Sequence, residues 1–315
     1  MDKIFIRPDV RELLDMIARI GGKQMHEVSP VEARLMFRKM AQIADAAPVE
    51  LPTIRDLSCP GPAGDIPLRL YDRRDSRGTT PVILFMHGGG FVVGDLESHN
   101  SFCTLLADRL DMPVLAVDYR LAPEHPFPAA PDDCVAAARW VASSPAELPF
   151  KVSGIIPCGD SAGGNLTTVV ALALTRTPAA APLLAQFPIY PAVDTQNRYP
   201  SMRSFADGYL LSRKSVIWFG QHYGATVDVE RHDTLHADPA GLPPTLVVTA
   251  SLDPLLDQGR AYRDRLAAAQ VPVRYYEAEG NIHGFITLRG LTPSSAADVE
   301  RIIDEMKEII AQVNQ

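Results

Sequence analysis

The sequence contains few cysteines and no long apolar run. Four cysteines occur in 315 residues without a C-x-x-C pair, so neither a thiolate metal cage nor a disulfide framework is indicated. We expect reduced, mostly buried thiols at these positions, which are Cys59, Cys103, Cys134 and Cys158. No eighteen consecutive apolar residues occur, and charges interrupt the apolar positions near the N-terminus, so neither a membrane span nor a secretory signal is predicted. A cytoplasmic protein with no membrane partner is therefore expected.

Basic residues are outnumbered as well. The chain has 30 Lys and Arg residues against 38 Asp and Glu residues, a formal net charge of −8, and it has no basic block. Its field should favour solubility and disfavour phosphate backbones, so no nucleic-acid partner is expected. The content of 46% hydrophobic and 22% charged residues is that of an ordinary globular protein with a large core. The 27 prolines predict many rigid loops.

The N-terminal segment predicts helices and no strand. Apolar residues recur at helical spacing over residues 9–20, and Gly21 follows as a helix stop. A second helix is expected to begin at Ser29, which can act as the cap, with Pro30 in the first turn and Glu32 completing a capping box.

The rest of the chain predicts one sheet with helices on both faces. Alternating apolar residues at 66–71 indicate a half-exposed edge strand paired with residues 51–58. Short apolar runs then alternate with helix-length stretches, which is typical of a parallel sheet. The predicted strands are Val82–Met86, Val114–Val117, Val152–Cys158, Leu183–Tyr190, Leu246–Ala250 and Val271–Tyr276, and the predicted helices span 98–111, 132–143, 162–174, 254–269 and 295–312. Residues 191–240 interrupt the alternation and are expected to form a lid or binding element.

A G-x-S-x-G motif lies between a predicted strand and a predicted helix. It reads Gly159-Asp160-Ser161-Ala162-Gly163, and its position is that of a nucleophile elbow. The flanking glycines allow a sharp turn that would hold the Ser161 hydroxyl clear of the sheet. The amino end of the following helix would direct free N–H groups at an oxyanion formed there.

A serine nucleophile needs a base within hydrogen-bond reach and a carboxylate that orients the base. Asp253 follows the predicted strand Leu246–Ala250, and His283 follows the last predicted strand, so the order serine, acid, histidine is that of α/β-hydrolases. Asp257, one turn later, is the competing acid. Because Ser161, Asp253 and His283 must converge, both halves of the chain have to contribute strands to one sheet, and the additional length is expected to form a cap.

Three consecutive glycines follow the strand Val82–Met86. Gly88, Gly89 and Gly90 are conformationally costly together, and close approach of their backbone amides to a ligand is a reason for such a run. With the N–H group of Ala162, directly after the candidate nucleophile, they are predicted to form an oxyanion hole.

Five separated motifs together resemble the hormone-sensitive-lipase-like branch of α/β-hydrolase carboxylesterases. The match runs from about residue 81 to 290, and the GDSAG form of the elbow is similar to that of a subgroup acting on short-chain acyl esters. The motifs are HGGGF at His87–Phe91, DYRLAPEHPFPAAPDD at Asp118–Asp133, GDSAGG at Gly159–Gly164, Asp253-Pro254-Leu255 and His283-Gly284-Phe285. Asn100 and Asn281 depart from the common pattern of the family, which leaves the preference among acyl groups open.

The resemblance implies an α/β-hydrolase fold with a mostly parallel eight-stranded sheet, helices on both faces and a helical cap. Residues 1–50 would supply the N-terminal cap helices, and residues 51–315 the catalytic domain with a cap insertion at about 191–240. The implied triad is Ser161, Asp253 and His283, with a small-molecule ester as substrate and neither cofactor nor metal. A homodimer is compatible with the last strand, which lies at a sheet edge in this fold.

Two other functions use the same fold. A non-catalytic small-molecule receptor tends to lose one triad residue, and an amidase would use the same groups. His232 and His236 have the spacing of a zinc pair, but the segment lacks the H-E-x-x-H glutamate and is interpreted as a solvated loop.

Several other residues with chemical potential are assigned structural roles. His87 is expected to brace the glycine loop, and the charged residues of the loop after the second parallel strand are expected to satisfy local backbone. The residues of this second group are Arg120, Glu124 and Asp132; core packing is the expected role of Tyr190, Tyr209, Trp218 and Phe219.

Overall fold

An eight-stranded sheet forms the centre of the protein in the computed structural model, which describes residues 4–225, 228 and 230–313. The strand order is β1-β2-β4-β3-β5-β6-β7-β8. β2 runs antiparallel to both β1 and β4, and the other neighbours pair in parallel. The strands are β1 (Thr53–Gly61), β2 (Gly64–Asp72), β3 (Thr79–Met86), β4 (Val114–Val117), β5 (Lys151–Asp160), β6 (Phe187–Ile189), β7 (Thr245–Leu252) and β8 (Val273–Ile282). The prediction of a mostly parallel eight-stranded sheet is confirmed.

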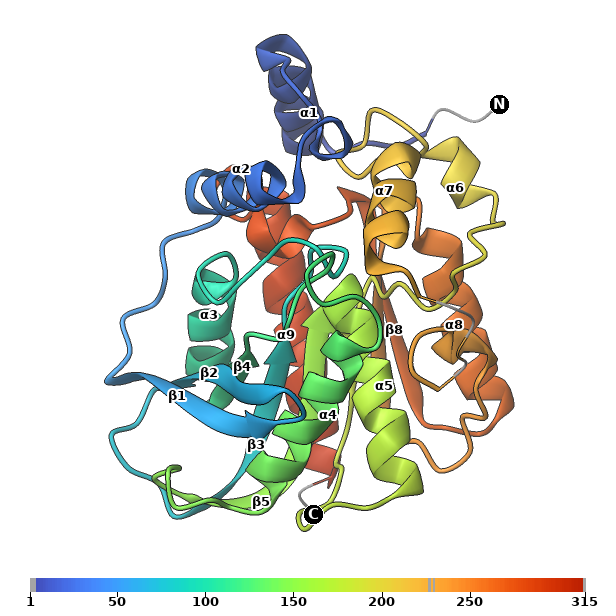
Figure 1. The fold of residues 1–315 in the computed structure, drawn as a ribbon. Coiled ribbons are helices and arrows are strands. Elements are labelled where there is room, and N and C mark those ends of the chain that lie inside the picture. The colour runs from blue at the N-terminus through green and yellow to red at the C-terminus, as the bar shows by residue number, and fades with distance from the viewer. Residues whose placement is uncertain (1–3, 226–227, 229, 314–315) are drawn as a thin grey trace.

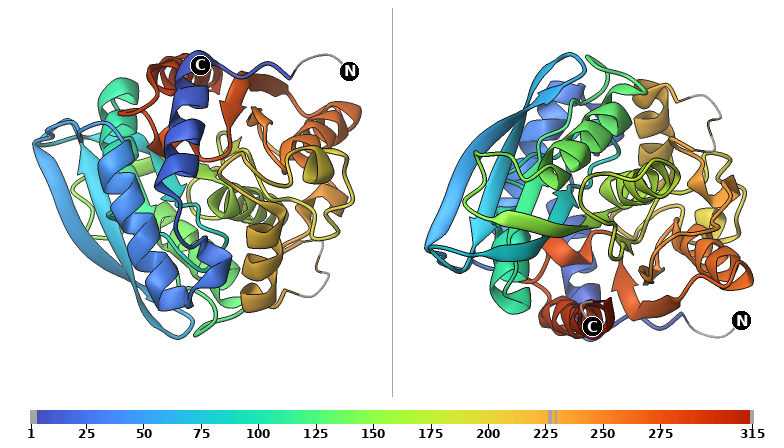
Figure 2. Two further views of the ribbon diagram at one scale, coloured as in Figure 1. Left: turned by 90° about the horizontal axis from the view of Figure 1, so that it is seen from above. Right: turned by 90° about the horizontal axis from the view of Figure 1, so that it is seen from below.

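Helices cover both faces of the sheet, as Figures 1 and 2 show. One face packs against α4, α5 and α8, and the other against α3 and α9. Along β3, Val82 and Leu84 enter the first core while Ile83 and Phe85 enter the second, which is why this strand is apolar at consecutive positions. The helices are α1 (Pro8–Ile20), α2 (Pro30–Ala44), α3 (Asn100–Leu110), α4 (Ala129–Ala142), α5 (Ala162–Arg176), α6 (Ser201–Ser204), α7 (Arg213–Tyr223), α8 (Leu256–Ala268) and α9 (Pro293–Val313).

The two N-terminal helices lie beyond the carboxyl ends of the parallel strands, at the same end of the molecule as α6 and α7 (Figure 1). α1 ends at Gly21, whose φ of 64° is left-handed, as the sequence predicts. α2 begins with the predicted capping box, because the Ser29 hydroxyl accepts from the Glu32 amide and the Glu32 carboxylate accepts from the Ser29 amide. Within the described ranges, no helix combines the length and the apolarity needed to cross a membrane.

Several predicted elements have different bounds in the structure. The last strand, predicted at Val271–Tyr276, is Val273–Ile282. The run Leu183–Tyr190 forms a strand only at Phe187–Ile189, because Leu183 and Gln186 make only isolated bridges. The helix expected from residue 254 begins at Leu256, after a turn in which the Asp253 carboxylate accepts from the Leu255 amide. The four cysteines are free and buried, as expected, and burial raises the pKa of Cys59 to about 12.

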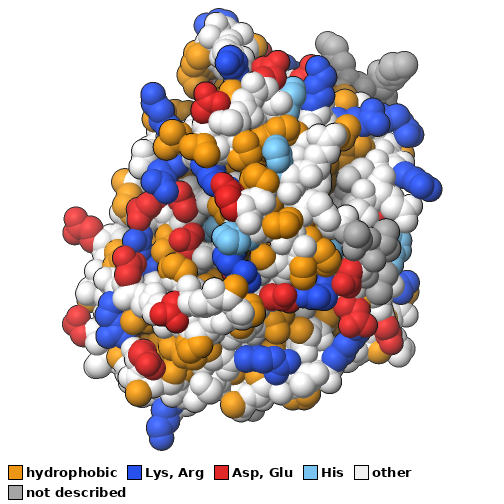
Figure 3. Space-filling view, in the orientation of Figure 1, with side chains coloured by type: hydrophobic (Ala, Val, Ile, Leu, Met, Phe, Trp, Pro, Cys, Tyr) orange, Lys and Arg blue, Asp and Glu red, His pale blue; other side chains and the backbone are white. Residues whose placement is uncertain are grey.

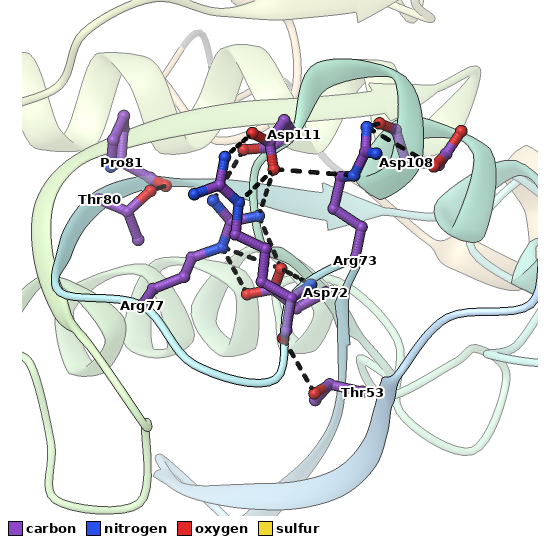
Figure 4. Close-up of polar contacts among 9 residues, drawn as sticks. Thr53, Asp72, Arg73, Arg77, Thr80, Pro81, Asp108 and Asp111 are labelled. Carbon is purple, nitrogen blue, oxygen red and sulfur yellow. Dashed lines mark hydrogen bonds and ion pairs between the residues drawn. The ribbon is translucent and has the colours of Figure 1, made fainter.

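A partly buried ion-pair cluster lies at the end of the sheet opposite α1 and α2 (Figure 4). The Arg77 side chain is only 8% exposed, and its guanidinium bridges Asp72 at the end of β2 and Asp111 after α3, at 2.7 and 2.9 Å. Asp111 itself is the left-handed cap of α3, with φ of 50°. The guanidinium therefore joins the end of an antiparallel strand to the end of a helix. Because the Arg77 side chain is buried, loss of both carboxylates would leave an unpaired charge, which is costly.

Protonation of Asp118, which directly follows β4, should make the free energy of unfolding depend on pH. Burial, and then the neighbouring Asp95 carboxylate, raise the pKa of Asp118 to about 6, against the pull of Arg38 and Arg69. The folded state therefore holds a proton that the unfolded state releases near pH 4, so this group lowers stability as the pH rises from about 4 to about 6.

We therefore expect Asp118→Asn to raise the free energy of unfolding at pH 8 by about 1–2 kcal/mol relative to the wild type. At pH 4 the difference should be close to zero, since both side chains are then neutral. Urea unfolding of both proteins at the two pH values measures this. The exposed Asp65, changed to Asn, is the control, and an Asp118→Asn protein that is no more stable at pH 8 than at pH 4, relative to the wild type, contradicts the prediction.

Candidate active site

Three loops at the carboxyl ends of parallel strands bring the predicted serine, acid and histidine together. Ser161 directly follows β5, Asp253 directly follows β7, and His283 directly follows β8. The Ser161 hydroxyl lies 2.8 Å from His283 Nε2, and His283 Nδ1 lies 2.6 Å from Asp253 Oδ2. The two distances are those of a hydrogen-bonded relay from a carboxylate through an imidazole to a hydroxyl.

The backbone at Ser161 is held in a sparsely populated conformation. Its φ of 56° and ψ of −114° place it between β5 and α5, and its amide donates to the Ile189 carbonyl at 2.9 Å. The flanking glycines are required by space, since a Cβ atom on Gly159 would lie 2.4 Å from the Met86 carbonyl oxygen and one on Gly163 only 1.9 Å from it. Glycine at both flanking positions of the G-x-S-x-G motif therefore allows the turn that directs the Ser161 hydroxyl away from the sheet.

Asp253 uses both carboxylate oxygens. The side chain is fully buried; Oδ2 faces His283, and Oδ1 accepts from the Leu255 amide at 2.8 Å. The competing acid, Asp257, lies elsewhere, because its carboxylate accepts from the Ser201 amide at 2.9 Å. Of the two acids that the sequence leaves open, the structure brings Asp253 to the histidine.

The glycine loop differs from the prediction at its first residue. The Gly88 amide donates to Asp160 Oδ1 at 2.7 Å, so it is engaged inside the protein and is not free to bind an oxyanion. Gly89 and Gly90 have φ of 124° and 59°, and they line the same cavity as Ser161 and Ala162. The predicted set of four backbone donors is therefore reduced to the last two glycines and Ala162.

Asp160 and His99 form a buried polar contact beneath the glycine loop that the sequence analysis did not single out. His99 Nε2 lies 3.1 Å from Asp160 Oδ1, and both side chains are nearly inaccessible. Burial opposes the ionisation of Asp160, but the His99 ring and the Gly88 amide outweigh it and hold the pKa of this carboxyl below its ordinary value. The available signal was an acidic residue at the end of an otherwise apolar strand.

His87 braces the glycine loop, as expected. Its Nδ1 lies 2.8 Å from the Gly88 carbonyl oxygen, and its ring stacks on Tyr119 with centroids 4.3 Å apart. Burial, reinforced by the His99 ring, lowers the pKa of His87 to about 4, so its ring is neutral at neutral pH.

A cavity of about 620 Å³ opens above Ser161 and His283. The N-terminal helices and α7 supply most of its upper wall, through Ile17, Met36, Met40 and Phe219. Met36 and Ile217 also reach the surface, being 36% and 49% exposed, and Figure 3 shows hydrophobic side chains over the cap helices. This wall of the cavity is mainly apolar, which suits an uncharged small molecule.

The predicted loop charges do make structural contacts. Arg120 pairs with the buried Asp133 at 2.7 Å, Glu124 pairs with Arg34 of α2, and Asp132 pairs with Arg231. The structural role is the predicted one, but the partners in these pairs are charged side chains and not the local backbone.

The interpretation of His232 as solvated is wrong. The ring is 9% exposed and lies among Phe91, Phe127 and Tyr223, because the segment after α7 folds back onto the aromatic core instead of standing in solvent. Burial lowers the pKa of His232 to about 4. In the part of the chain that the structure describes, no group of three or more His, Cys, Asp and Glu side chains is placed to hold a metal ion.

The predicted aromatic residues divide between core and cavity. Tyr190 is buried beside His283, with ring centroids 4.6 Å apart, and Tyr209 packs on Phe205. Trp218 packs against the core. Phe219 is the exception, because its ring reaches Gly90 and lines the cavity, so core packing is not its whole role.

A serine on a strand-to-helix elbow, an adjoining histidine and acid, and a mostly parallel sheet define an α/β hydrolase. Residues 83–287 match the α/β-hydrolase fold family. The chain belongs to this family, in its hormone-sensitive-lipase-like branch of carboxylesterases.

Named relatives are similar over most of the chain. An ethyl acetate hydrolase of Pseudomonas putida is 34% identical, covering 96% of this chain and 99% of the relative. The carboxylesterase NlhH of Mycobacterium tuberculosis is 34% identical over 96% of this chain and 97% of its own. Among solved structures, a serine-to-alanine mutant of LAE6, an α/β-hydrolase enzyme from the Lake Arreo metagenome, has a TM-score of 0.91 at 34% identity, covering 98% of this chain and 99% of LAE6.

Proposed function

We propose that the protein is a serine carboxylesterase that hydrolyses short-chain acyl esters through an acyl-enzyme on Ser161. The observation that carries the proposal is the relay at the floor of the cavity, with 2.8 Å from the Ser161 hydroxyl to His283 and 2.6 Å from His283 to Asp253. A hydroxyl within hydrogen-bond reach of an oriented imidazole is the arrangement that activates a serine for attack on a carbonyl.

In the proposed reaction, Ser161 Oγ attacks the ester carbonyl carbon while His283 Nε2 takes its proton. The carbonyl oxygen becomes an oxyanion, and the N–H groups of Gly89, Gly90 and Ala162 would donate to it. Asp253 stabilises the imidazolium, which then protonates the leaving alcohol as the acyl-enzyme forms. Water repeats these steps on the acyl-enzyme and releases the carboxylic acid.

The preference for short acyl chains rests on two supports. One relative is named an ethyl acetate hydrolase, and side chains of α1, α2 and α7 form part of the wall of the cavity of about 620 Å³. We expect kcat/KM for p-nitrophenyl esters to be highest for acyl chains of about two to six carbons and to fall for longer ones, since longer chains would have to displace the cap. A maximum at ten carbons or more would contradict the assignment of short chains.

A covalent probe of the serine separates an esterase from a receptor. A fluorophosphonate should add its phosphonyl mass to the protein and to one peptide, the one that contains Ser161, because only an activated serine reacts. A receptor of the same fold would leave Ser161 unmodified. Rates on an ester and an amide with the same acyl group distinguish the esterase from an amidase, and a faster amide would favour the amidase.

A cytoplasmic location and a homodimer stay predictions. β8 is an edge strand of the sheet, and a second copy could add along it away from Gly280, whose carbonyl already accepts from the Arg7 amide at 3.2 Å. Light scattering with size-exclusion chromatography measures the assembly directly.

A further inference from the structure

Arg34, on the cap helix α2, binds the backbone of the loop that follows the three glycines. Its Nε donates to the Val92 carbonyl at 2.8 Å, and one η nitrogen donates to the Ala122 carbonyl at 2.8 Å. The remaining donors meet the Glu124 carboxylate at 2.9 and 2.5 Å, and this contact lowers the pKa of Glu124 to about 2. One guanidinium therefore joins the cap helix to two segments of the sheet domain.

The peptide that Arg34 binds belongs to the glycine turn itself. The Val92 and Val93 amides both donate to the Gly89 carbonyl, at 3.0 and 2.9 Å. The second carbonyl that Arg34 binds is connected to the same turn, because the Ala122 amide donates to the Phe91 carbonyl at 2.9 Å. The guanidinium thus closes a network that runs from α2 through residues 89–93.

The turn needs such support, because its backbone is intrinsically flexible. Gly89 and Gly90 have left-handed φ values, which glycine adopts freely and which therefore cost entropy to hold. Oxyanion stabilisation depends on donors that are already oriented before the charge develops. Three side chains hold this turn. The Asp160 carboxylate binds the Gly88 amide, and the Phe219 ring of α7 lies against Gly90. Arg34 of α2 binds the Val92 carbonyl.

We propose that Arg34 is a positioning residue that couples the docking of α2 to the geometry of the oxyanion loop. With Arg34 in place, the turn at residues 89–93 is held in the conformation that aims the Gly89 and Gly90 amides at the cavity. Without it, α2 still covers the substrate, but the donors are less ordered and the transition state is stabilised less. The inference rests on the proposed esterase activity and deepens it.

Arg38 supplies the matched control. It lies one helical turn after Arg34 on the same helix and also ties α2 to the sheet domain, through a 2.7 Å hydrogen bond to the Asp95 carboxylate. It makes this contact with a side chain and not with the backbone of the glycine turn. If Arg34 only tethers the helix, loss of either arginine should have a similar effect on catalysis.

The experiment compares Arg34→Ala, Arg34→Lys and Arg38→Ala in the full-length protein with p-nitrophenyl acetate. We expect Arg34→Ala to lower kcat about 10–100-fold with KM changed less than about threefold, a smaller loss than the ~10²–10³ caused by removing an oxyanion donor itself. Arg34→Lys should retain the fold and still lose kcat, because an ammonium cannot bind two carbonyls and a carboxylate in one plane. Arg38→Ala should keep kcat within about threefold of the wild type.

A trifluoromethyl ketone provides the second readout, because it forms a hemiketal oxyanion with the serine. Its inhibition constant should rise in Arg34→Ala and Arg34→Lys in parallel with the loss of kcat, and stay unchanged in Arg38→Ala. Equal losses in Arg34→Ala and Arg38→Ala, or a change confined to KM, overturn the positioning role. If Arg34→Ala does not fold, Arg34→Lys decides between the two outcomes. If the wild-type protein neither hydrolyses esters nor reacts with a fluorophosphonate, the proposed function is contradicted, and not only the role of Arg34.

Discussion

Ser161→Ala is expected to lower kcat for p-nitrophenyl acetate by about 10⁶-fold, the scale found when other serine hydrolases lose their nucleophile. In the proposed reaction the Ser161 hydroxyl forms the acyl bond, and His283 Nε2 lies 2.8 Å from it. Removing one oxygen leaves the elbow intact, because the backbone at this position is held by the Ile189 carbonyl and by the close approach of the two flanking glycines.

The measurement requires a preparation free of wild-type protein, because a trace of it would dominate the residual rate. Ser143→Ala serves as the control, since the Ser143 hydroxyl caps the end of α4 at the Trp140 carbonyl, on the surface. Thermal unfolding should show that both variants keep the native fold. Hydrolysis by Ser161→Ala at more than about one hundredth of the wild-type rate, in that clean preparation, would sink the assignment of the nucleophile.

The elements that carry the site could be predicted because each depends on local sequence. Strands β3, β5 and β7 are buried at most positions, and each contains the mostly apolar run that predicts it. Ser161 and Asp253 come directly after the carboxyl ends of β5 and β7, so placing the strands places both residues at one edge of the sheet. His283 follows β8, an edge strand that contains charged residues and whose observed end, Ile282, lies beyond the predicted end, Tyr276.

The corrections concern contacts between segments that are distant in the sequence. Whether the Gly88 amide is free depends on the side chain that lies across from it, and that side chain, Asp160, is 72 residues away. His232 is buried because the inserted segment folds onto Phe91 and Tyr223, which no local pattern reveals. The contact of Arg34 with Val92 likewise spans 58 residues and requires the docked cap helix.

Asp253→Asn is expected to lower kcat/KM by about 10⁴-fold, as when other serine hydrolases lose the charge of this acid. Both carboxylate oxygens face donors, the imidazole at 2.6 Å and the Leu255 amide at 2.8 Å. A carboxamide has one acceptor oxygen, so one of these donors must meet an NH₂ group. If the NH₂ group faces the imidazole, Nδ1 must act as the acceptor, and the proton moves to Nε2, which then cannot take the proton of Ser161.

The control for this substitution is Asp257→Asn, since Asp257 lies in the first turn of α8, shortly after Asp253, and binds the Ser201 amide instead of His283. We expect this variant to keep kcat/KM within about tenfold of the wild type, because a carboxamide oxygen can still accept from that amide. Steady-state rates on p-nitrophenyl acetate compare the two variants under one set of conditions. The opposite ranking, with Asp257→Asn inactive and Asp253→Asn active, would mean that the acid of the relay is misassigned, because only the residue that orients the imidazole can have the larger effect on proton transfer from Ser161.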